Sequence, residues 1–129
     1  MRALLDTHTA LWMAMDPAKL GAGARSLVLD AEVSRLVSAA SILELGIKHR
    51  LGELAQAAPV LADLPQAFAG WAARELPMTA AQAALAGALD WEHRDPFDRI
   101  LAAQAIMEGA VLVSKDTAFD TAPGLRRVW

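Results

Sequence analysis

The sequence has 129 residues, of which 55% are hydrophobic and none is cysteine, and its formal net charge at pH 7 is −3. This composition predicts one folded domain over residues 1–129 and excludes a disulfide framework or a thiolate metal site. No apolar run reaches the roughly 18 residues that span a bilayer, and the chain begins too acidic for a signal peptide. The absence of cysteine fits a reducing compartment, so we expect a cytoplasmic protein. The negative charge counts against a sequence-blind nucleic-acid binder, unless basic residues gather locally or metal offsets the acids.

Strands and helices are predicted to alternate along the chain. The predicted strands are 2–5, 34–38, 76–78 and 110–114, with 127–129 as the candidate for a last edge strand. The predicted helices are one capped by Thr7, one at 22–31, one from Ser38 or Ser41 to near Gly52, one at 60–74, one from Thr79 to about Leu89, and one from Asp95 to Gly109. This order predicts an α/β fold with a mainly parallel sheet of four to five strands and helices on both faces.

Four acidic residues come at or after the ends of apolar runs, where strand turns to helix: Asp6, Glu44, Asp98 and Asp116. In a parallel sheet the ligand site lies outside the carboxyl ends of the strands, so we expect these side chains to meet there. Two like charges about 4 Å apart repel by roughly 1 kcal/mol in water-like surroundings and about 4 kcal/mol at an effective dielectric near 20. Because a fold gains nothing from such a cluster, the pattern predicts a divalent cation.

Each acid also has a structural interpretation when it is considered alone, as a turn residue, a helix cap or one half of a surface pair. Glu44 can pair with Lys48 four residues later, and Asp98 can pair with Arg99. Asp95, directly before a proline, is a good N-cap residue, and we favour that capping role for it. The case for a site therefore rests on the four acids together.

Three segments together resemble the PIN-domain family and, within it, the VapC-like ribonuclease toxins of bacterial toxin–antitoxin pairs. They are LLDTHTALW (4–12), VSAASILELGIK (37–48), and HRDPFDRILAAQA (93–105) followed by VLVSKD (111–116). Leu43 stands where this subgroup often has Trp, and Ser114 where Thr is common. Neither departure removes a carboxylate.

The resemblance implies a three-layer α/β/α sandwich and an Mg²⁺- or Mn²⁺-dependent endoribonuclease that cleaves single-stranded or structured cellular RNA. By position, the candidate catalytic residues and metal ligands are Asp6, Glu44, Asp98 and Asp116, with Asp6 and Asp98 the firmest. The resemblance also implies a toxin that a small cognate antitoxin neutralises, a homodimer, and cleavage products with a 5′-phosphate and a 3′-hydroxyl.

Two other functions remain open at this point. One is a PIN-like protein that binds RNA or a partner without cleaving, which the intact acidic set argues against. The other is a phospho-receiver domain, which the length and Lys115 after a strong strand would suit. A receiver needs an acidic pair after its first strand, but Asp6 has no acidic neighbour, and the second strand ends in Ser38 in place of a phosphorylatable Asp.

The remaining polar and aromatic residues allow two interpretations. Basic residues near the acids can contact RNA phosphates or form solvated helix faces: Lys48, His49, Arg50, Arg94 and Arg99. Trp12 and Trp71 have the spacing of helical packing residues, and Trp91 can be a packing or a base-stacking residue. The wide apolar faces expected of helices 22–31 and 60–74 would suit an oligomer or partner interface.

Overall fold

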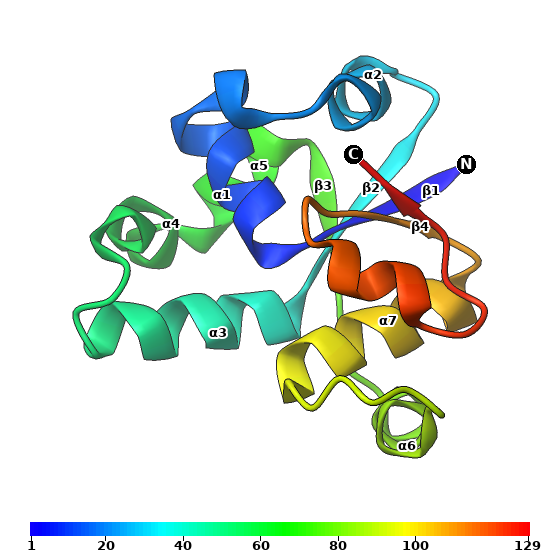
Figure 1. Ribbon diagram of the computed structural model, residues 1–129. Helices are drawn as coiled ribbons and strands as arrows, with labels where there is room; N and C mark the ends of the chain where they lie inside the picture. Colours follow the sequence, from blue (N-terminus) through cyan, green and yellow to red (C-terminus); the bar gives the residue numbers. More distant parts are fainter.

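The computed structural model describes all 129 residues and is built on a five-stranded sheet (Figure 1). The strands are β1 (Arg2–Leu5), β2 (Ser34–Ser38), β3 (Ala73–Leu76), β4 (Val111–Val113) and β5 (Arg127–Val128). Their order in the sheet is β3-β2-β1-β4-β5, and all four neighbouring pairs are parallel. The predicted α/β fold, including the last edge strand, is confirmed.

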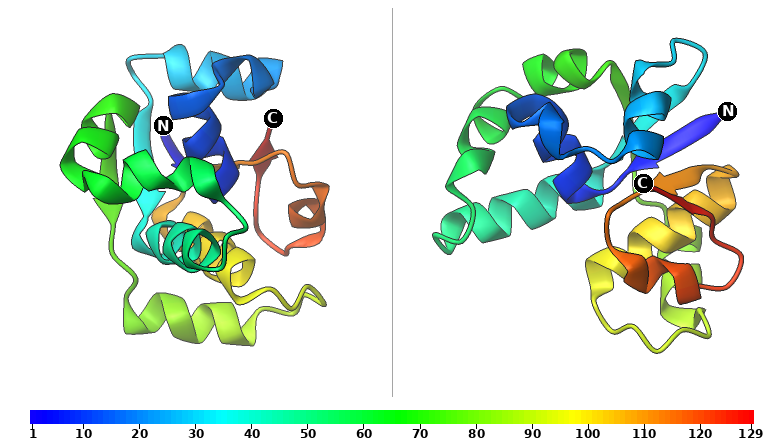
Figure 2. Two further views of the ribbon diagram at one scale, coloured as in Figure 1. Left: turned by 90° about the vertical axis from the view of Figure 1, so that its left-hand side faces the viewer. Right: turned by 45° about the horizontal axis from the view of Figure 1, so that its top comes forward.

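Seven α-helices connect and cover the strands, as expected when every strand runs the same way. They are α1 (Thr7–Met15), α2 (Ala22–Leu29), α3 (Ala39–Arg50), α4 (Ala58–Ala62), α5 (Leu64–Trp71), α6 (Ala80–Ala88) and α7 (Pro96–Glu108). Helices α1 and α2 lie on the opposite side of the sheet from α6 and α7 (Figures 1 and 2). The predicted three layers are therefore present. None of the helices combines the length and apolar character needed to cross a membrane.

The central strand β1 is buried on both faces and joins two hydrophobic clusters. Its side chains alternate, so that Ala3 and Leu5 pack in one cluster and Leu4 in the other. The first cluster contains the fully buried Trp71 of α5, and the second contains Phe119. Trp71 is thus a packing residue, as its spacing predicted.

The chain departs from the prediction between residues 58 and 78. The single helix expected at 60–74 is two helices, α4 and α5, which meet at Asp63. A proline in the first turn of α5 favours a new start there, and Asp63 accepts a hydrogen bond from the amide of Gln66 at 3.1 Å.

The third strand is also displaced from its predicted place. We expected it at 76–78, but β3 covers Ala73–Leu76. Helix α5 ends at Ala72, whose φ of 47° is left-handed, and the chain enters the sheet directly afterwards. Pro77 has no amide hydrogen to donate to a ladder, which is consistent with the end of the strand before it.

Candidate active site

All four predicted acids line one cavity of about 180 Å³ at the carboxyl edge of the sheet. Asp6 follows β1 directly, and Asp116 comes three residues after β4. Glu44 lies on α3, which begins where β2 ends, and Asp98 lies in the first turn of α7. The other residues around the cavity are Thr7, His8, Lys48, Asp95 and Leu101. Four segments far apart in the sequence thus bring their carboxylates to one place.

Asp6 is only 9% exposed and is held by the backbone around it. Its Oδ1 accepts a hydrogen bond from the amide of Thr9 at 2.8 Å, which makes Asp6 the N-cap of α1. Its Oδ2 accepts a hydrogen bond from the hydroxyl of Ser114. The prediction that Thr7 caps this helix is wrong, because the carboxylate one residue earlier satisfies the free amide.

Glu44 is buried and is paired at both oxygens. The hydroxyl of Thr7 donates to its Oε1 at 2.7 Å and also lies 2.9 Å from the hydroxyl oxygen of Ser41. The Lys48 amine donates to Oε2 at 2.6 Å, so the predicted pair between Glu44 and Lys48 is confirmed. Partial burial lowers the pKa of Lys48, but the bond and charge of Glu44, with Asp95 and Asp98 nearby, raise it overall.

The carboxyl of Asp98 has a raised pKa. Burial raises that pKa from 3.8 to about 6, and the charges of Asp95 and Glu44 also raise it, while the hydrogen bond and charge of His93 lower it. The Nε2 of His93 lies 2.6 Å from Oδ2 of Asp98. The surface pair between Asp98 and Arg99 that sequence allowed does not form, because Arg99 bonds elsewhere.

Asp116 and Asp95 both act as caps in the structure. Oδ1 of Asp116 accepts a hydrogen bond from the amide of Ala118 at 2.9 Å and begins the short 3-10 helix Thr117–Thr121. Oδ1 of Asp95 accepts from the amides of Phe97 and Asp98 at 2.9 and 3.2 Å. The predicted capping role of Asp95 is confirmed, and Asp116 has a cap geometry alongside its place in the cavity.

Ser114 links two of the acids and was missed as a functional residue by sequence reasoning. Its hydroxyl donates to Asp6, and its oxygen accepts from the amide of Asp116 at 3.1 Å. Its side chain is fully buried. The signal that could have found it was its place between the strand and Asp116, where a hydroxyl reaches both carboxylate segments.

His93 is a further residue beside the acids that sequence reasoning did not single out. In the structure it contacts Asp98 and stacks on Trp91, with ring centroids 4.7 Å apart. Trp91 is buried in the second hydrophobic cluster, which assigns it to packing. The five-residue step from His93 to Asp98 gives no periodic signal, because a loop and a helix start lie between them.

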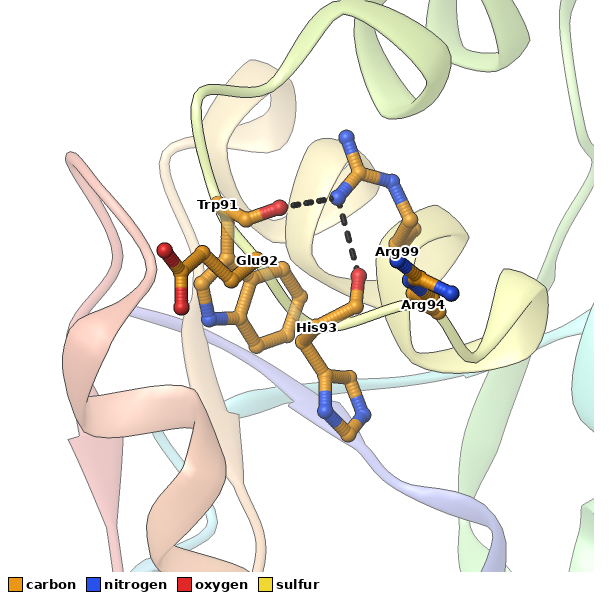
Figure 3. Close-up of a pocket in the computed structure, with 5 residues that line it drawn as sticks. All are labelled: Trp91, Glu92, His93, Arg94 and Arg99. Carbon is orange, nitrogen blue, oxygen red and sulfur yellow. Dashed lines mark hydrogen bonds between the residues drawn. The ribbon is translucent and has the colours of Figure 1, made fainter.

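A cavity of about 800 Å³, larger than the acidic one, is formed around the loop that carries His93 (Figure 3). It is lined by Trp91, Glu92, His93, Arg94 and Arg99, and the His93 side chain connects it to Asp98. The Arg99 guanidinium donates to the carbonyls of Trp91 and His93 at 2.6 and 2.9 Å, as Figure 3 shows.

Arg99 also bonds the end of the preceding helix and the loop after it. Its remaining acceptors are the carbonyls of Ala86, Gly87 and Leu89, at 2.8, 3.4 and 2.7 Å. A guanidinium with five backbone acceptors has no donor left for RNA phosphate. Arg99 therefore shapes the loop that carries His93, and the phosphate-binding interpretation of this residue is wrong.

The chemistry of the donors suits a hard divalent cation. Carboxylate and hydroxyl oxygens surround the cavity, with no thiolate, and Mg²⁺ and Mn²⁺ prefer oxygen ligands. No three acidic or histidine side chains are spaced to hold one ion among themselves. Protein donors occupy both oxygens of Asp6 and of Glu44, and one each of Asp98 and Asp116. Since Mg²⁺ keeps several waters, one or two carboxylates are enough to hold it.

Comparison with known proteins gives a consistent result at the level of sequence. Residues 3–125 match the family model described as the PIN domain. The chain is 35% identical over 114 residues to "Ribonuclease VapC22" of Mycobacterium tuberculosis, which covers 88% of this chain and 85% of the relative. The resemblance stated from the sequence motifs is confirmed.

Solved structures show the same fold at lower identity. VapBC from Salmonella typhimurium, solved bound to DNA, has a TM-score of 0.69 at 21% identity and covers 98% of this chain and 96% of that one. VapBC2 from Rickettsia felis, bound to a promoter fragment, has a TM-score of 0.69 at 17% identity, with coverage of 98% and 97%. VapC20 of Mycobacterium tuberculosis, a sarcin–ricin loop cleaving toxin, has a TM-score of 0.56 at 18% identity, with coverage of 96% and 98%.

Proposed function

The chain belongs to the PIN domain family, and on that premise we propose that it is a divalent-metal-dependent endoribonuclease of the VapC type. The observation that carries the proposal is the cavity in which Asp6, Glu44, Asp98 and Asp116 meet. Four carboxylates at one point repel each other, and a bound cation offsets that cost. The ribonuclease name of the 35% identical relative supports RNA as the substrate.

We assign the four acids different duties. Asp6 and Asp98 would hold Mg²⁺ or Mn²⁺, Asp116 would complete that site through a metal-bound water or hold a second ion, and Glu44 would bind a second ion or orient the attacking water. A bound Mg²⁺ supplies an activated water and a stabilising charge for the phosphate. The protein fixes the ligands beforehand, since Thr9 and Ser114 orient Asp6 while neighbouring donors orient Glu44.

The test is cleavage of a labelled single-stranded RNA by the purified chain. We expect cleavage with Mg²⁺ or Mn²⁺, none with EDTA, and products that carry a 5′-phosphate and a 3′-hydroxyl. Asp6→Asn and Asp98→Asn should each reduce the rate by at least about a hundredfold, given that even residues behind metal ligands cost ten- to a hundredfold.

Asp63→Asn is the matched control, because it removes one carboxylate from an exposed cap outside the cavity and Asn remains a good cap. It should cleave at the wild-type rate. Cleavage that survives in the Asp6→Asn, Asp98→Asn double variant would refute the assignment. A chain that binds RNA tightly and never cleaves it would instead be the silent PIN-like module.

The proposal includes a partner, an assembly and a location. One solved structure of the same fold is a toxin–antitoxin complex from Klebsiella pneumoniae. By analogy, this chain would be one nuclease domain over residues 1–129 that a small cognate antitoxin neutralises in the cytoplasm. It would also form a homodimer. Induction of the chain alone should arrest growth, co-expression of the neighbouring antitoxin gene should restore it, and size measurement of each sample should report the assembly.

A further inference from the structure

We propose that a second cavity, built around Trp12 beside the acidic one, binds a nucleotide of single-stranded RNA next to the cleaved phosphate. The base would stack on the rings of Trp12 and His8, and the amine of Lys115 would pair with a phosphate. This inference rests on the proposed function and adds to it a substrate subsite with named contacts.

The cavity of about 290 Å³ is lined by Asp6, His8, Trp12, Lys115 and Asp116. Three of these residues, Asp6, His8 and Asp116, also line the acidic cavity, so the two cavities share a wall. Ligand pockets begin at roughly 300 Å³, and one nucleotide is among the smaller ligands of that range. A chain of nucleotides passing the acids can therefore place one residue here.

The aromatic wall comes from one side of α1. His8 and Trp12 are four residues apart and lie on the same face of the helix. Their ring centroids are 5.7 Å apart, with an angle of 49° between the planes. His8 is exposed and Trp12 is half-buried against the first hydrophobic cluster. The packing role predicted for Trp12 is confirmed, since the ring packs against the first cluster. The same ring also lines this cavity.

The ring of Trp12 also contacts the ring of Trp129. The two centroids lie 5.9 Å apart, edge to face. Trp129 in turn fits tightly over Gly21, where an added Cβ would lie only 2.6 Å from the Trp129 ring. A fixed aromatic ring loses little entropy when a base stacks on it, and such stacking is tolerant of base identity.

The cationic contact comes from Lys115, directly before Asp116. Its amine lies 6.0 Å from the Trp12 ring centroid, and it takes part in none of the four ion pairs of the structure. By contrast, Lys48, which lines the acidic cavity, is paired with Glu44. Lys115 is thus the exposed ammonium beside the acids that is free to pair with phosphate.

The combination favours a nucleotide over other occupants. A base stacks on an aromatic face and a phosphate pairs with a nearby cation, and the Lys115 amine lies over the Trp12 ring, on a flexible side chain that an entering base can displace toward the phosphate. The adjoining carboxylates repel an anion by themselves, so the phosphate is expected on the Lys115 side unless metal is bound in the acidic cavity. A protein partner is the competing occupant, and the experiment below separates the two.

The experiment measures binding of a fluorescent single-stranded RNA of about ten nucleotides by anisotropy, in an Asp98→Asn background that prevents cleavage. A series of the same RNA carries one abasic residue at each position in turn. Trp12→Leu should weaken binding of intact RNA by roughly five- to 150-fold, the range expected for loss of one stacked base. Where the abasic residue occupies the subsite, Trp12→Leu should cause no further loss.

Lys115→Gln tests the phosphate contact without disturbing the core. It should weaken binding of every RNA by a similar factor. The slope of log affinity against log salt concentration should fall by about one phosphate contact. Lys19→Gln is the matched control, because Lys19 lies 5.6 Å from the same ring centroid but does not line the cavity. It should leave both the affinity and the salt dependence unchanged.

Four outcomes decide the matter. Unchanged RNA binding by folded Trp12→Leu and Lys115→Gln overturns the subsite, even if the wild type cleaves RNA. If Trp12→Leu weakens the binding of intact RNA and of every abasic RNA by the same factor, base stacking at this site is overturned. A Trp12→Leu variant that binds RNA normally and loses only antitoxin binding overturns it as well. If the wild type never cleaves RNA, but the effect of Trp12→Leu on affinity still depends on the position of the abasic residue, the subsite is supported and the nuclease proposal is refuted. If Trp12→Leu does not fold, the Lys115→Gln salt dependence and the wild-type abasic series decide.

Discussion

The hydroxyl of Thr7 donates a hydrogen bond to Oε1 of Glu44 at 2.7 Å, although 37 positions separate the two residues in the sequence. Thr7 directly follows Asp6, so the bond ties the segment after β1 to the middle of α3. The spacing between two of the proposed ligands thus depends on one hydroxyl.

Thr7→Val should keep the shape of this side chain and remove its hydrogen bond. Because a buried carboxylate oxygen is left without its donor, we expect a loss of about 1–3 kcal/mol in the free energy of unfolding, measured with denaturant. Metal-dependent RNA cleavage should fall at least about tenfold, as for other residues that orient metal ligands. Thr7→Ser keeps the hydroxyl and should retain most of both properties. Equal activity of the Val and Ser variants would refute the positioning role.

Lys48→Gln should destabilise the protein most when no divalent metal is present. The variant leaves Glu44 without its ion pair, 2.6 Å in the wild type, beside other carboxylates. A cation then replaces the missing charge, so Mg²⁺ should raise the melting temperature of Lys48→Gln more than that of the wild type. Thermal unfolding with and without Mg²⁺ measures the difference, and Lys19→Gln serves as the exposed-lysine control. An equal or smaller shift in Lys48→Gln would contradict a metal role for this cavity.

The raised pKa of Asp98 predicts a pH-dependent stability for the metal-free protein. Between the ordinary value of 3.8 and the folded value of about 6, the folded chain holds a proton that the unfolded chain has lost. The contribution of Asp98 to stability therefore falls as pH rises through this window, by at most about 3 kcal/mol. Above pH 6, Asp98→Asn should be more stable than the wild type without metal, and the two should converge near the acidic end of the window.

Denaturant unfolding of both proteins across this pH range, in EDTA, measures the effect. Addition of Mg²⁺ at neutral pH should then favour the wild type, because the ionised Asp98 gains a cation and the Asn variant does not. A wild type that remains the more stable of the two at neutral pH in EDTA would show that His93 outweighs burial at this carboxyl.

Arg99→Ala should be among the most destabilising changes in the chain. It leaves five carbonyls between Ala86 and His93 without their donor, several of them sheltered from water. We expect a loss of roughly 2–4 kcal/mol, at the high end for single substitutions. Arg99→Lys should recover little, since one ammonium cannot reproduce the planar guanidinium. Arg94→Ala, on the same loop and exposed, should cost less than about 0.5 kcal/mol. Thermal or chemical unfolding of the three variants makes the comparison.

Much of the fold was accessible from the sequence, because strong local signals agree with the global arrangement. The strand at 34–38 and the helix that begins after Asp95 were found where apolar runs meet good caps. The region 58–78 was misjudged for two physical reasons: a proline pattern compatible with one helix or two, and a left-handed Ala72, a conformation that alanine rarely adopts.

In the acidic cavity, too, contacts that follow from the strand order were predictable, and contacts between distant side chains were not. That Asp6 and Asp116 would meet followed from parallel strand ends, which share an edge of the sheet. The contacts of Thr7 with Glu44 and of Ser114 with Asp6 join segments 37 and 108 residues apart, and no spacing in one chain encodes them. Arg99 was misread for a similar reason, because an arginine beside an acid does not reveal that its acceptors are backbone carbonyls.

Arg99 fixes its loop through backbone atoms and not through side chains. The guanidinium binds main-chain carbonyls, which every amino acid possesses, so this anchoring of the loop does not depend on which side chains the loop carries. Asp90, Glu92 and Arg94 are exposed, and none of them is bonded to Arg99. Substitutions at these exposed positions can therefore change the charge and shape around the large cavity while the anchored backbone keeps its course.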